Sequence, residues 1–258
     1  MTERRREGSA PGRPDQPTIA VVQARMGSHR LPGKALEQIG DRPLILWTLA
    51  ALTAVGRLDG VIVATTTLAE DDRLAALLRD RSWNVHRGSV RDVLTRCWEA
   101  VAPARPTLVV RATADNPFID PAVVTAQIER TVQGGYDYVG TAGWPLGIAA
   151  EVATATALEA AFREATDPAE REHVMPFLYN RPGRFRIGSA PPPEPPTAGR
   201  FTVDTAEDLA FARAIAQRLG PASGPPSLRM LAEIVQAEPA LVDLNRSVRQ
   251  KTWQETEQ

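Results

Sequence analysis

Two hydrophobic patterns alternate along the first half of the chain. Short, nearly continuous apolar runs are typical of strands buried on both faces of a parallel sheet. They occupy residues 18–25, 60–66 and 107–113, with a briefer strand expected at 84–88. Segments with helical spacing of apolar residues follow these runs, at 43–54, 71–81, 92–102 and 121–133. This alternation predicts an α/β domain with a largely parallel sheet.

The alternation becomes looser in the second half of the chain. Further strands are expected at 136–141, 149–154, 185–190 and 200–205, and helices at 156–165, 169–180 and 206–219. The N-terminal segment is rich in Gly, Pro, Ser and Arg, a composition that predicts disorder. We therefore expect a disordered arm at 1–16, one folded domain at 17–219, and a linker with a C-terminal tail at 220–258.

Composition narrows the class of protein. Of the 258 residues, 43% are apolar, which is enough to bury a substantial core. The 30 basic and 31 acidic residues nearly cancel, so we expect no nucleic acid and no anionic membrane as a partner. A single cysteine, Cys97, excludes a disulfide framework and a cysteine-based zinc site. No apolar run is long enough to span a bilayer and no secretory signal is recognisable, so a cytoplasmic protein is expected.

A cationic loop that contains glycines follows the first strand. Residues 25–34 read Arg-Met-Gly-Ser-His-Arg-Leu-Pro-Gly-Lys, and such a loop either binds an anion or is a solvated surface segment. Lys34 is notable because the chain has only two lysines among its 30 basic residues. The spacing fits neither a Walker A loop, which needs one residue fewer before Gly-Lys, nor the Rossmann glycine pattern. This would be a different type of phosphate-binding loop.

Two aspartates at predicted strand ends have no evident structural role. Asp115 and Asp204 each lie where a predicted strand ends. Neighbouring residues, namely Asp120 and the pair Thr205 and Asp208, are better placed to cap the helices that follow. Two carboxylates near a cationic loop form a plausible Mg²⁺ site, which substrate phosphates and water would complete.

Together with three further motifs, the loop resembles the spore-coat-polysaccharide cytidylyltransferase-like family. The motifs are Gln-Ala-Arg-Met-Gly-Ser-His-Arg-Leu-Pro-Gly-Lys (23–34), Arg-Ala-Thr-Ala-Asp-Asn-Pro (111–117), Arg-Glu-His-Val (171–174) and Thr-Val-Asp-Thr-Ala-Glu-Asp-Leu (202–209). The resemblance covers residues 18–216. It implies a GT-A/Rossmann-like nucleotidyltransferase fold, which is a three-layer α/β sandwich with a mostly parallel mixed sheet, related to the CMP-sugar-acid synthetases. The folded domain would then be a cytidylyltransferase domain.

The resemblance also implies a reaction and a set of site residues. Members transfer CMP from CTP to a small acceptor with release of pyrophosphate, and Mg²⁺ is the implied cofactor. The resemblance assigns catalysis to Arg25, Lys34, Asp115 and Asp204, with both aspartates as metal ligands. It assigns nucleotide binding to Ala24, Arg25, Gly27, Arg30, Lys34, Ala64, Arg87 and Thr113, and acceptor binding to Glu151, Arg171 and His173. A homodimer is also implied.

The acceptor side departs from the family pattern. Ala149 and Leu146 stand where relatives commonly carry acidic residues, whereas the nucleotide motifs are intact. Fewer carboxylates mean fewer hydrogen bonds to sugar hydroxyls and less repulsion of an anion. We therefore expect an acceptor more anionic or less hydroxylated than the usual sugar acids, and a sugar acid, a phosphonate and a phosphorylated compound all stay open. The alternative functions are a GT-A glycosyltransferase and a catalytically inactive CTP-binding module.

Overall fold

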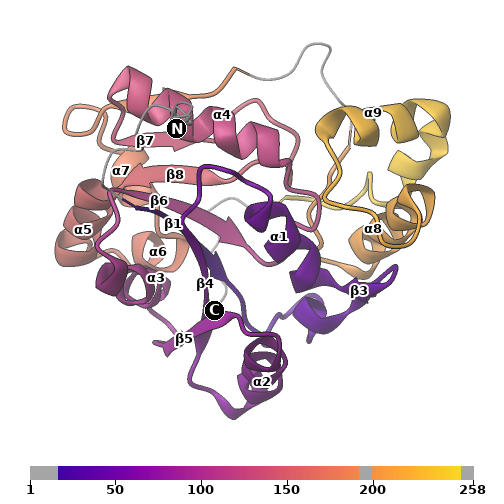
Figure 1. Cartoon of the computed structure of the whole chain (residues 1–258), viewed down its shortest axis with the longest axis horizontal. Helices are drawn as coiled ribbons and strands as arrows, with labels where there is room; N and C mark the ends of the chain where they lie inside the picture. Colours follow the sequence, from indigo (N-terminus) through magenta and orange to yellow (C-terminus); the bar gives the residue numbers. More distant parts are fainter. Residues whose placement is uncertain (1–16, 192–198, 251–258) are drawn as a thin grey trace, which may run out of the picture.

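A seven-stranded sheet forms the centre of the molecule (Figure 1). The computed structural model describes residues 17–191 and 199–250. The strand order is β5-β4-β1-β6-β8-β7-β9, and of these strands only β8 runs antiparallel to its neighbours. The strands are β1 (Thr18–Gln23), β4 (Gly60–Thr66), β5 (Asn84–Gly88), β6 (Leu108–Thr113), β7 (Tyr138–Gly140), β8 (Glu151–Thr154) and β9 (Ile187–Ser189). The expected α/β fold with a mostly parallel mixed sheet is confirmed.

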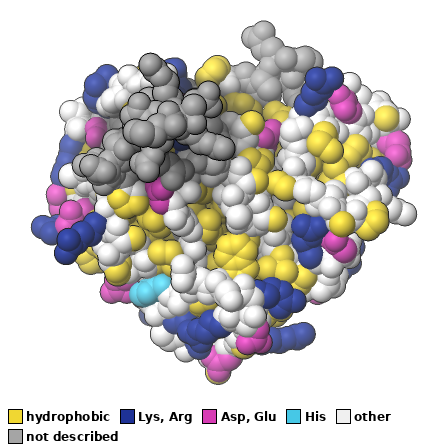
Figure 2. Space-filling model, in the orientation of Figure 1, with side chains coloured by type: hydrophobic (Ala, Val, Ile, Leu, Met, Phe, Trp, Pro, Cys, Tyr) yellow, Lys and Arg dark blue, Asp and Glu magenta, His cyan; other side chains and the backbone are white. Residues whose placement is uncertain are grey.

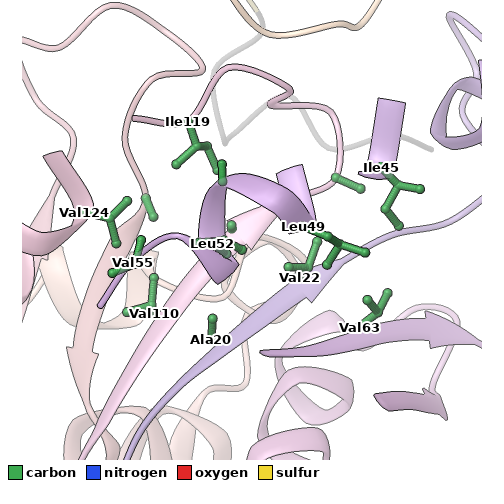
Figure 3. Close-up of a cluster of buried hydrophobic side chains, with 14 of the residues drawn as sticks. Ala20, Val22, Ile45, Leu49, Leu52, Val55, Val63, Val110, Ile119 and Val124 are labelled. Carbon is green, nitrogen blue, oxygen red and sulfur yellow. The ribbon is translucent and has the colours of Figure 1, made fainter. Parts of the chain in front are cut away.

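Helices cover both faces of the sheet and complete the expected three-layer sandwich. One face carries α1 (Leu44–Thr53), α2 (Asp72–Asp80) and α4 (Pro121–Gly134). The other carries α3 (Val93–Val101), α5 (Ala155–Glu164), α6 (Pro168–His173) and α7 (Pro176–Tyr179). Side chains alternate along β1, so Ala20 and Val22 face the first layer while Ile19 and Val21 face the second. Figure 3 shows the first core, in which Leu49 of α1 packs over β1.

The C-terminal helices form a third core at one end of the molecule. This core contains α8 (Ala206–Leu219), α9 (Leu228–Ala237), the 3-10 helix η4 (Pro239–Leu244) and the hairpin of β2 (Gln38–Ile39) and β3 (Arg42–Pro43). In Figure 1 these yellow and orange helices lie on the opposite side of the molecule from α5. The remaining 3-10 helices are η1 (Lys34–Leu36), η2 (Ala69–Asp71) and η3 (Ala102–Ala104). Residues 228–244 therefore pack against the body of the protein.

The strand expected at 200–205 is absent from the structure. The Val203 N–H donates to the carbonyl of Asp115, 2.8 Å away, in the loop after β6. The Phe201 N–H donates to the carbonyl of Leu146, also 2.8 Å away. Because these partners lie in loops, the segment is extended and tightly held but has no neighbouring strand with which to form a ladder.

The helix expected at 169–180 is two short helices, α6 and α7. They are separated at Val174, whose φ of 72° lies outside the helical range. Pro176 follows two residues later and lacks the backbone N–H that a continuous helix requires. The apolar spacing continues across this break because Val174 and Met175 are both fully buried.

The helix caps expected from the sequence are present. Asp120 accepts the N–H of Ala122 at the start of α4. Thr205 and Asp208 form a reciprocal capping box at the start of α8. Since other residues cap these helices, Asp115 and Asp204 stand outside the caps, as the sequence predicts.

Charged side chains of both signs are interspersed around the face shown in Figure 2. None of the helices in the described ranges is long and apolar enough to cross a membrane. The cysteine at position 97 is free and buried. The expected arm at 1–16 and the end of the expected tail, residues 251–258, lie outside the described residues.

Candidate active site

Two central strands end side by side at one edge of the sheet. After β1, the chain adds β4 and β5 on one side of this strand and then crosses to its other side to form β6. Gln23 at the end of β1 is the register partner of Thr113 at the end of β6. In open α/β sheets a ligand crevice forms at such a point. A cleft of about 430 Å³ lies there, lined by these strand ends, by α3, α6 and α7, and by Thr202 and Asp204.

Three charged side chains meet in the cleft. Lys34 Nζ lies 2.8 Å from a carboxylate oxygen of Asp115 and 2.8 Å from one of Asp204. It also donates to the carbonyl of Val203, 3.0 Å away. Lys34 is 81 positions from Asp115 and 170 from Asp204, so only the fold brings the three together. We call Lys34, Asp115 and Asp204 the charge cluster.

Backbone contacts hold the loop that leads to Lys34. Gly33 has a φ of 76°, a left-handed conformation that favours glycine, and its N–H donates to the carbonyl of Met26, 2.8 Å away. The Met26 N–H in turn donates to the carboxylate of Asp71, at 2.6 Å. The buried Asp71 also accepts from Thr66 at the end of β4. The loop is therefore fixed to the neighbouring strand before it reaches Lys34.

Two arginines add positive charge around Asp204. Arg200 pairs with Asp204 and with the buried Asp208, and Arg30 Nη2 lies 3.2 Å from Asp204. Burial favours the neutral acid, but Lys34 and the two arginines outweigh it and lower the pKa of Asp204 below its ordinary value of 3.8. Burial also opposes the charge of Lys34, but its two carboxylate partners raise its pKa above 10.5. At neutral pH the aspartate is therefore ionised and the lysine protonated.

The charge cluster fits a cation held between two carboxylates. The ammonium of Lys34 shows that one oxygen of Asp115 and one of Asp204 can converge on a single positive charge. Mg²⁺ is commonly bound through one or two carboxylates together with substrate phosphates and water. No group of three or more His, Cys, Asp or Glu side chains within 17–191 and 199–250 could hold a metal ion. The donor set thus suits a Mg²⁺ ion that shares its coordination with a phosphate ligand.

A second polar network lies in the wall of the cleft, at β6 and β8. Arg111 pairs with Glu151 and donates to the side-chain oxygen of Gln23, and the Tyr138 hydroxyl donates to Glu151 at 2.7 Å. Burial opposes the charge of Arg111, but Glu151 raises its pKa. Burial and Glu151 also raise the pKa of Tyr138, and burial raises the pKa of Tyr179 in the cleft wall to about 12. Glu151, a predicted acceptor residue, is thus fixed by two donors.

A strained turn positions His173 in the cleft wall. His173 is the last residue of α6 and lines the cleft with Glu172. Val174 follows with φ 72° and ψ −58°, and the Met175 N–H donates to the carbonyl of His173, 2.9 Å away. These angles define a γ-turn, which is strained for a β-branched residue. Such strain persists where surrounding packing enforces it, and it is concentrated at functional sites.

Most of the predicted site residues line this one cleft. Those that do are Ala24, Arg25, Arg30, Lys34, Thr113, Asp115, Glu151, His173 and Asp204. The other four predicted residues, Gly27, Ala64, Arg87 and Arg171, are not among the residues that line it.

The two predicted arginines outside the cleft are engaged in local contacts. Arg87 pairs with Asp72 and also donates to two backbone carbonyls near the end of β4. Arg171 pairs with Asp92 and donates to the hydroxyl of Thr95, 2.8 Å away, which joins α6 to α3. In this structure Arg171 supports the wall that carries His173.

The two predicted small residues outside the cleft shape the backbone. Ala64 is fully buried in β4, and its carbonyl accepts the N–H of Ala24 at 3.1 Å. At Gly27 an added Cβ would lie 2.5 Å from a carboxylate oxygen of Glu70. The absence of a side chain at Gly27 therefore leaves room for the carboxylate of Glu70 in η2.

Several polar residues of the cleft are not among the predicted site residues, namely Arg96, Arg111, Asn116, Glu172 and Tyr179. Three of them, Arg111, Asn116 and Glu172, lie within the quoted motifs, which offer a signal by which they can be found. Arg96 lies in an amphipathic helix, and its polar character there suggests only a solvated helix face. The structure instead buries Arg96 to 1% exposure.

Fold and cleft together define the class of α/β nucleotidyltransferases, and solved structures of that class resemble this chain. More particularly, the chain belongs to the cytidylyltransferase family, whose profile matches residues 19–219. The resemblance read from the sequence motifs is therefore confirmed, and with it the assignment as a cytidylyltransferase.

Individual relatives match most of the chain. The uncharacterised protein MJ1063 of Methanocaldococcus jannaschii is 34% identical, over 93% of this chain and 99% of MJ1063. The spore coat polysaccharide biosynthesis protein SpsF of Bacillus subtilis is 35% identical, over 78% of this chain and 87% of SpsF. Among solved structures, a cytidylyltransferase from Leptospira borgpetersenii has a TM-score of 0.83 at 26% identity, covering 91% of this chain and 100% of that chain.

Proposed function

We propose that this protein transfers CMP from CTP to a small anionic acceptor, with Mg²⁺ bound at the charge cluster and pyrophosphate released. Membership of the cytidylyltransferase family supports the choice of nucleotide. The observation that carries the proposal is the convergence of Asp115 and Asp204 on one cation, 2.8 Å from each. Arg25 and Arg30 line the same cleft and supply positive charge for the triphosphate.

The proposed reaction forms one bond at the α-phosphorus and breaks another. An acceptor oxygen attacks the α-phosphorus while the bond to the oxygen that bridges to the β-phosphate breaks, and pyrophosphate leaves. Transfers of this kind depend on positioning and on neutralisation of phosphate charge rather than on covalent help from the protein. Mg²⁺, when bound, supplies Lewis-acid stabilisation of the charge on the phosphate oxygens.

The residues of the charge cluster would exchange partners when CTP binds. Asp115 and Asp204 would hold the metal. Lys34 would then pair with phosphate oxygens in place of the carboxylates. Arg25 and Arg30 would bind phosphate oxygens as planar, forked donors.

The ends of the central strands are proposed to bind the nucleoside. Ala24 and Thr113 line the cleft at the ends of β1 and β6. Gly27, Ala64 and Arg87 are proposed to contribute to nucleoside binding indirectly. Gly27 would act through the loop, Ala64 through its backbone carbonyl, and Arg87 through its contacts at the end of β4. These assignments rest on the motifs of the family.

The acceptor is proposed to bind beside Glu151 and His173, with Arg171 as a support for that wall. Leu146 lines the cleft and is 39% exposed, at a position where the motifs of relatives suggest an acid. An apolar residue there lacks the like-charge repulsion that a carboxylate would exert on an anion. Ala149 is buried in the apolar core with α8, so its substitution bears less on the acceptor. A phosphonate or a phosphorylated compound is therefore favoured over an ordinary sugar acid.

Release of pyrophosphate separates this proposal from its alternatives. A GT-A glycosyltransferase would consume a nucleotide sugar without releasing pyrophosphate, and an inactive module would bind CTP without turnover. We also propose a cytoplasmic homodimer, for which the resemblance to the family is the support. Light scattering of the purified protein tests the dimer.

The experiment measures pyrophosphate release from CTP and Mg²⁺ with matched panels of acceptors, one of sugar acids and one of phosphonates and phosphorylated compounds. We expect turnover on the anionic panel, its loss with EDTA and its recovery with Mg²⁺. Leu146→Asp should lower that turnover, whereas Val132→Asp, at an exposed position outside the cleft, should not. Turnover of sugar acids alone would contradict the acceptor, and no release with any acceptor would contradict the reaction.

A further inference from the structure

One arginine in the wall of the cleft is buried without a carboxylate of the described residues in direct contact. Arg96 of α3 is 1% exposed and lines the cleft. Its Nη1 donates to the carbonyl of Ser89, whereas its buried Nε has no hydrogen-bond partner among the described residues. A buried guanidinium normally has a carboxylate partner, because burial of an unpaired charge is strongly unfavourable.

The two aspartates whose charges act on Arg96 form their hydrogen bonds and ion pairs with other groups. Asp71 and Asp92 are the aspartates whose charges act on Arg96. Asp71 accepts hydrogen bonds from the backbone and hydroxyl of Thr66. Asp92 pairs with Arg171. Both charges favour the ionised guanidinium from a distance, but neither carboxylate forms an ion pair or a hydrogen bond with Arg96.

The surrounding chain accommodates Arg96 closely. At Gly88 an added Cβ would lie 3.2 Å from Arg96 Cγ and 2.9 Å from His86 Nε2, so a side chain at this position would crowd both residues. Burial lowers the pKa of Arg96, and the positive charge of Arg25 lowers it further. The protein thus keeps an unfavourable positive charge in the wall of its cleft, a feature typical of ligand-binding groups.

We propose that Arg96 binds an oxyanion, a phosphate or carboxylate group, of a substrate that occupies the cleft. Guanidinium groups form charge-assisted, often bidentate hydrogen bonds with such groups. The oxyanion has two possible sources, the α-phosphate of the nucleotide and an anionic group of the acceptor. The identity of the nucleotide in this inference rests on the proposed function. The presence of an oxyanion site does not.

Binding of defined probes, measured by isothermal titration calorimetry, tests the proposal. The probes are inorganic phosphate, cytidine, CMP and the non-hydrolysable α,β-methylene analogue of CTP with Mg²⁺. Arg96→Gln should weaken phosphate binding by about ten- to hundredfold, the range for loss of hydrogen bonds to a charged group. Arg96→Lys should weaken it less, and Arg73→Gln, at an exposed arginine of α2, should leave it unchanged.

Two comparisons identify the source of the oxyanion. If it is the α-phosphate, the preference of the protein for CMP over cytidine should fall in Arg96→Gln by the same factor. If it belongs to the acceptor, that preference should stay, and phosphate binding to the complex with the methylene analogue should weaken instead. The proposal would be overturned if Arg96→Gln bound every probe with unchanged affinity. It would also be overturned if the wild type bound no phosphate, either as the free protein or as the complex with the methylene analogue.

The melting temperature without ligand separates this function from a structural role. Removal of an unpaired buried charge should leave the melting temperature of Arg96→Gln unchanged or raise it. A lower melting temperature together with unchanged affinities would overturn the proposal, because Arg96 would then serve the fold. A wild-type protein that binds phosphate but no cytidine nucleotide would refute the proposed function while Arg96 could still be tested with phosphate.

Discussion

The charge cluster and Arg96 line the same cleft, but the charges of the cluster are paired with one another whereas that of Arg96 is not. In the cluster, which we call balanced because every charged group has an oppositely charged partner, Lys34 lies 2.8 Å from both Asp115 and Asp204. In α3, Arg96 is buried with an Nε that no described residue pairs. A balanced cluster is stable by itself and must rearrange when a ligand arrives, whereas an unbalanced charge is stabilised by the ligand. The cleft thus has one part suited to a cation and another suited to an anion.

The largest effect is expected when a carboxylate of the balanced part loses its charge. Asp115→Asn or Asp204→Asn should lower kcat by about a thousandfold or more, roughly 4 kcal/mol, because each removes a charge that the metal needs. Asp80→Asn, at an exposed aspartate of α2, is the matched control. Mg²⁺-dependent pyrophosphate release near the wild-type rate in either variant would show that the two aspartates share no metal.

A smaller but still large effect is expected when the cluster loses its ammonium. Lys34→Met leaves Asp115 without its cationic partner beside a second carboxylate, that of Asp204, so the free energy of unfolding should fall by about 3 kcal/mol. Millimolar Mg²⁺ should restore part of that loss without nucleotide, because the position between the carboxylates is then free for a metal ion. Urea unfolding with and without Mg²⁺ measures both effects, with the exposed Arg79→Met as control. A variant as stable as the wild type and insensitive to Mg²⁺ would refute the balanced cluster.

The smallest of these effects is expected from acid. The pKa of Asp204 is lowered in the folded protein by its cationic partners, although burial opposes this. Its stabilising contribution is therefore fully present above its ordinary pKa of 3.8 and is lost as the pH falls through the lower value of the folded state. Urea unfolding as a function of pH should show a shallower acid loss in Asp204→Asn than in the wild type. Identical slopes would mean that Asp204 is not held ionised by the cluster.

The sheet and the balanced part of the cleft could be predicted from the sequence for different reasons. Buried parallel strands read as apolar runs, so β1, β4 and β6 are visible directly. The sequence indicates Asp115 and Asp204 by elimination, since their neighbours cap the helices. What the sequence does not show is that Lys34 lies between them, because the three residues come from distant segments of the chain.

The remaining features depend on tertiary contacts that leave no periodic signal. Residues 200–205 look like a strand, but they bond to loop carbonyls and have no neighbouring strand. The break at Val174 is a local γ-turn within a continuous apolar pattern. Arg96 has the sequence appearance of a solvated residue, and its burial arises only when α3 packs against the sheet beside Gly88.

The central claim is that this cleft binds CTP together with Mg²⁺. The most direct test is to measure the melting temperature of the protein with each of the four nucleoside triphosphates, with and without Mg²⁺. CTP with Mg²⁺ should stabilise the wild type most, by about 2.7 kcal/mol at a hundred times its dissociation constant. The Mg²⁺-dependent part of that stabilisation should be missing in Asp115→Asn. A flat response to CTP beside a clear response to GTP or ATP would contradict the assignment of this protein as one that uses CTP.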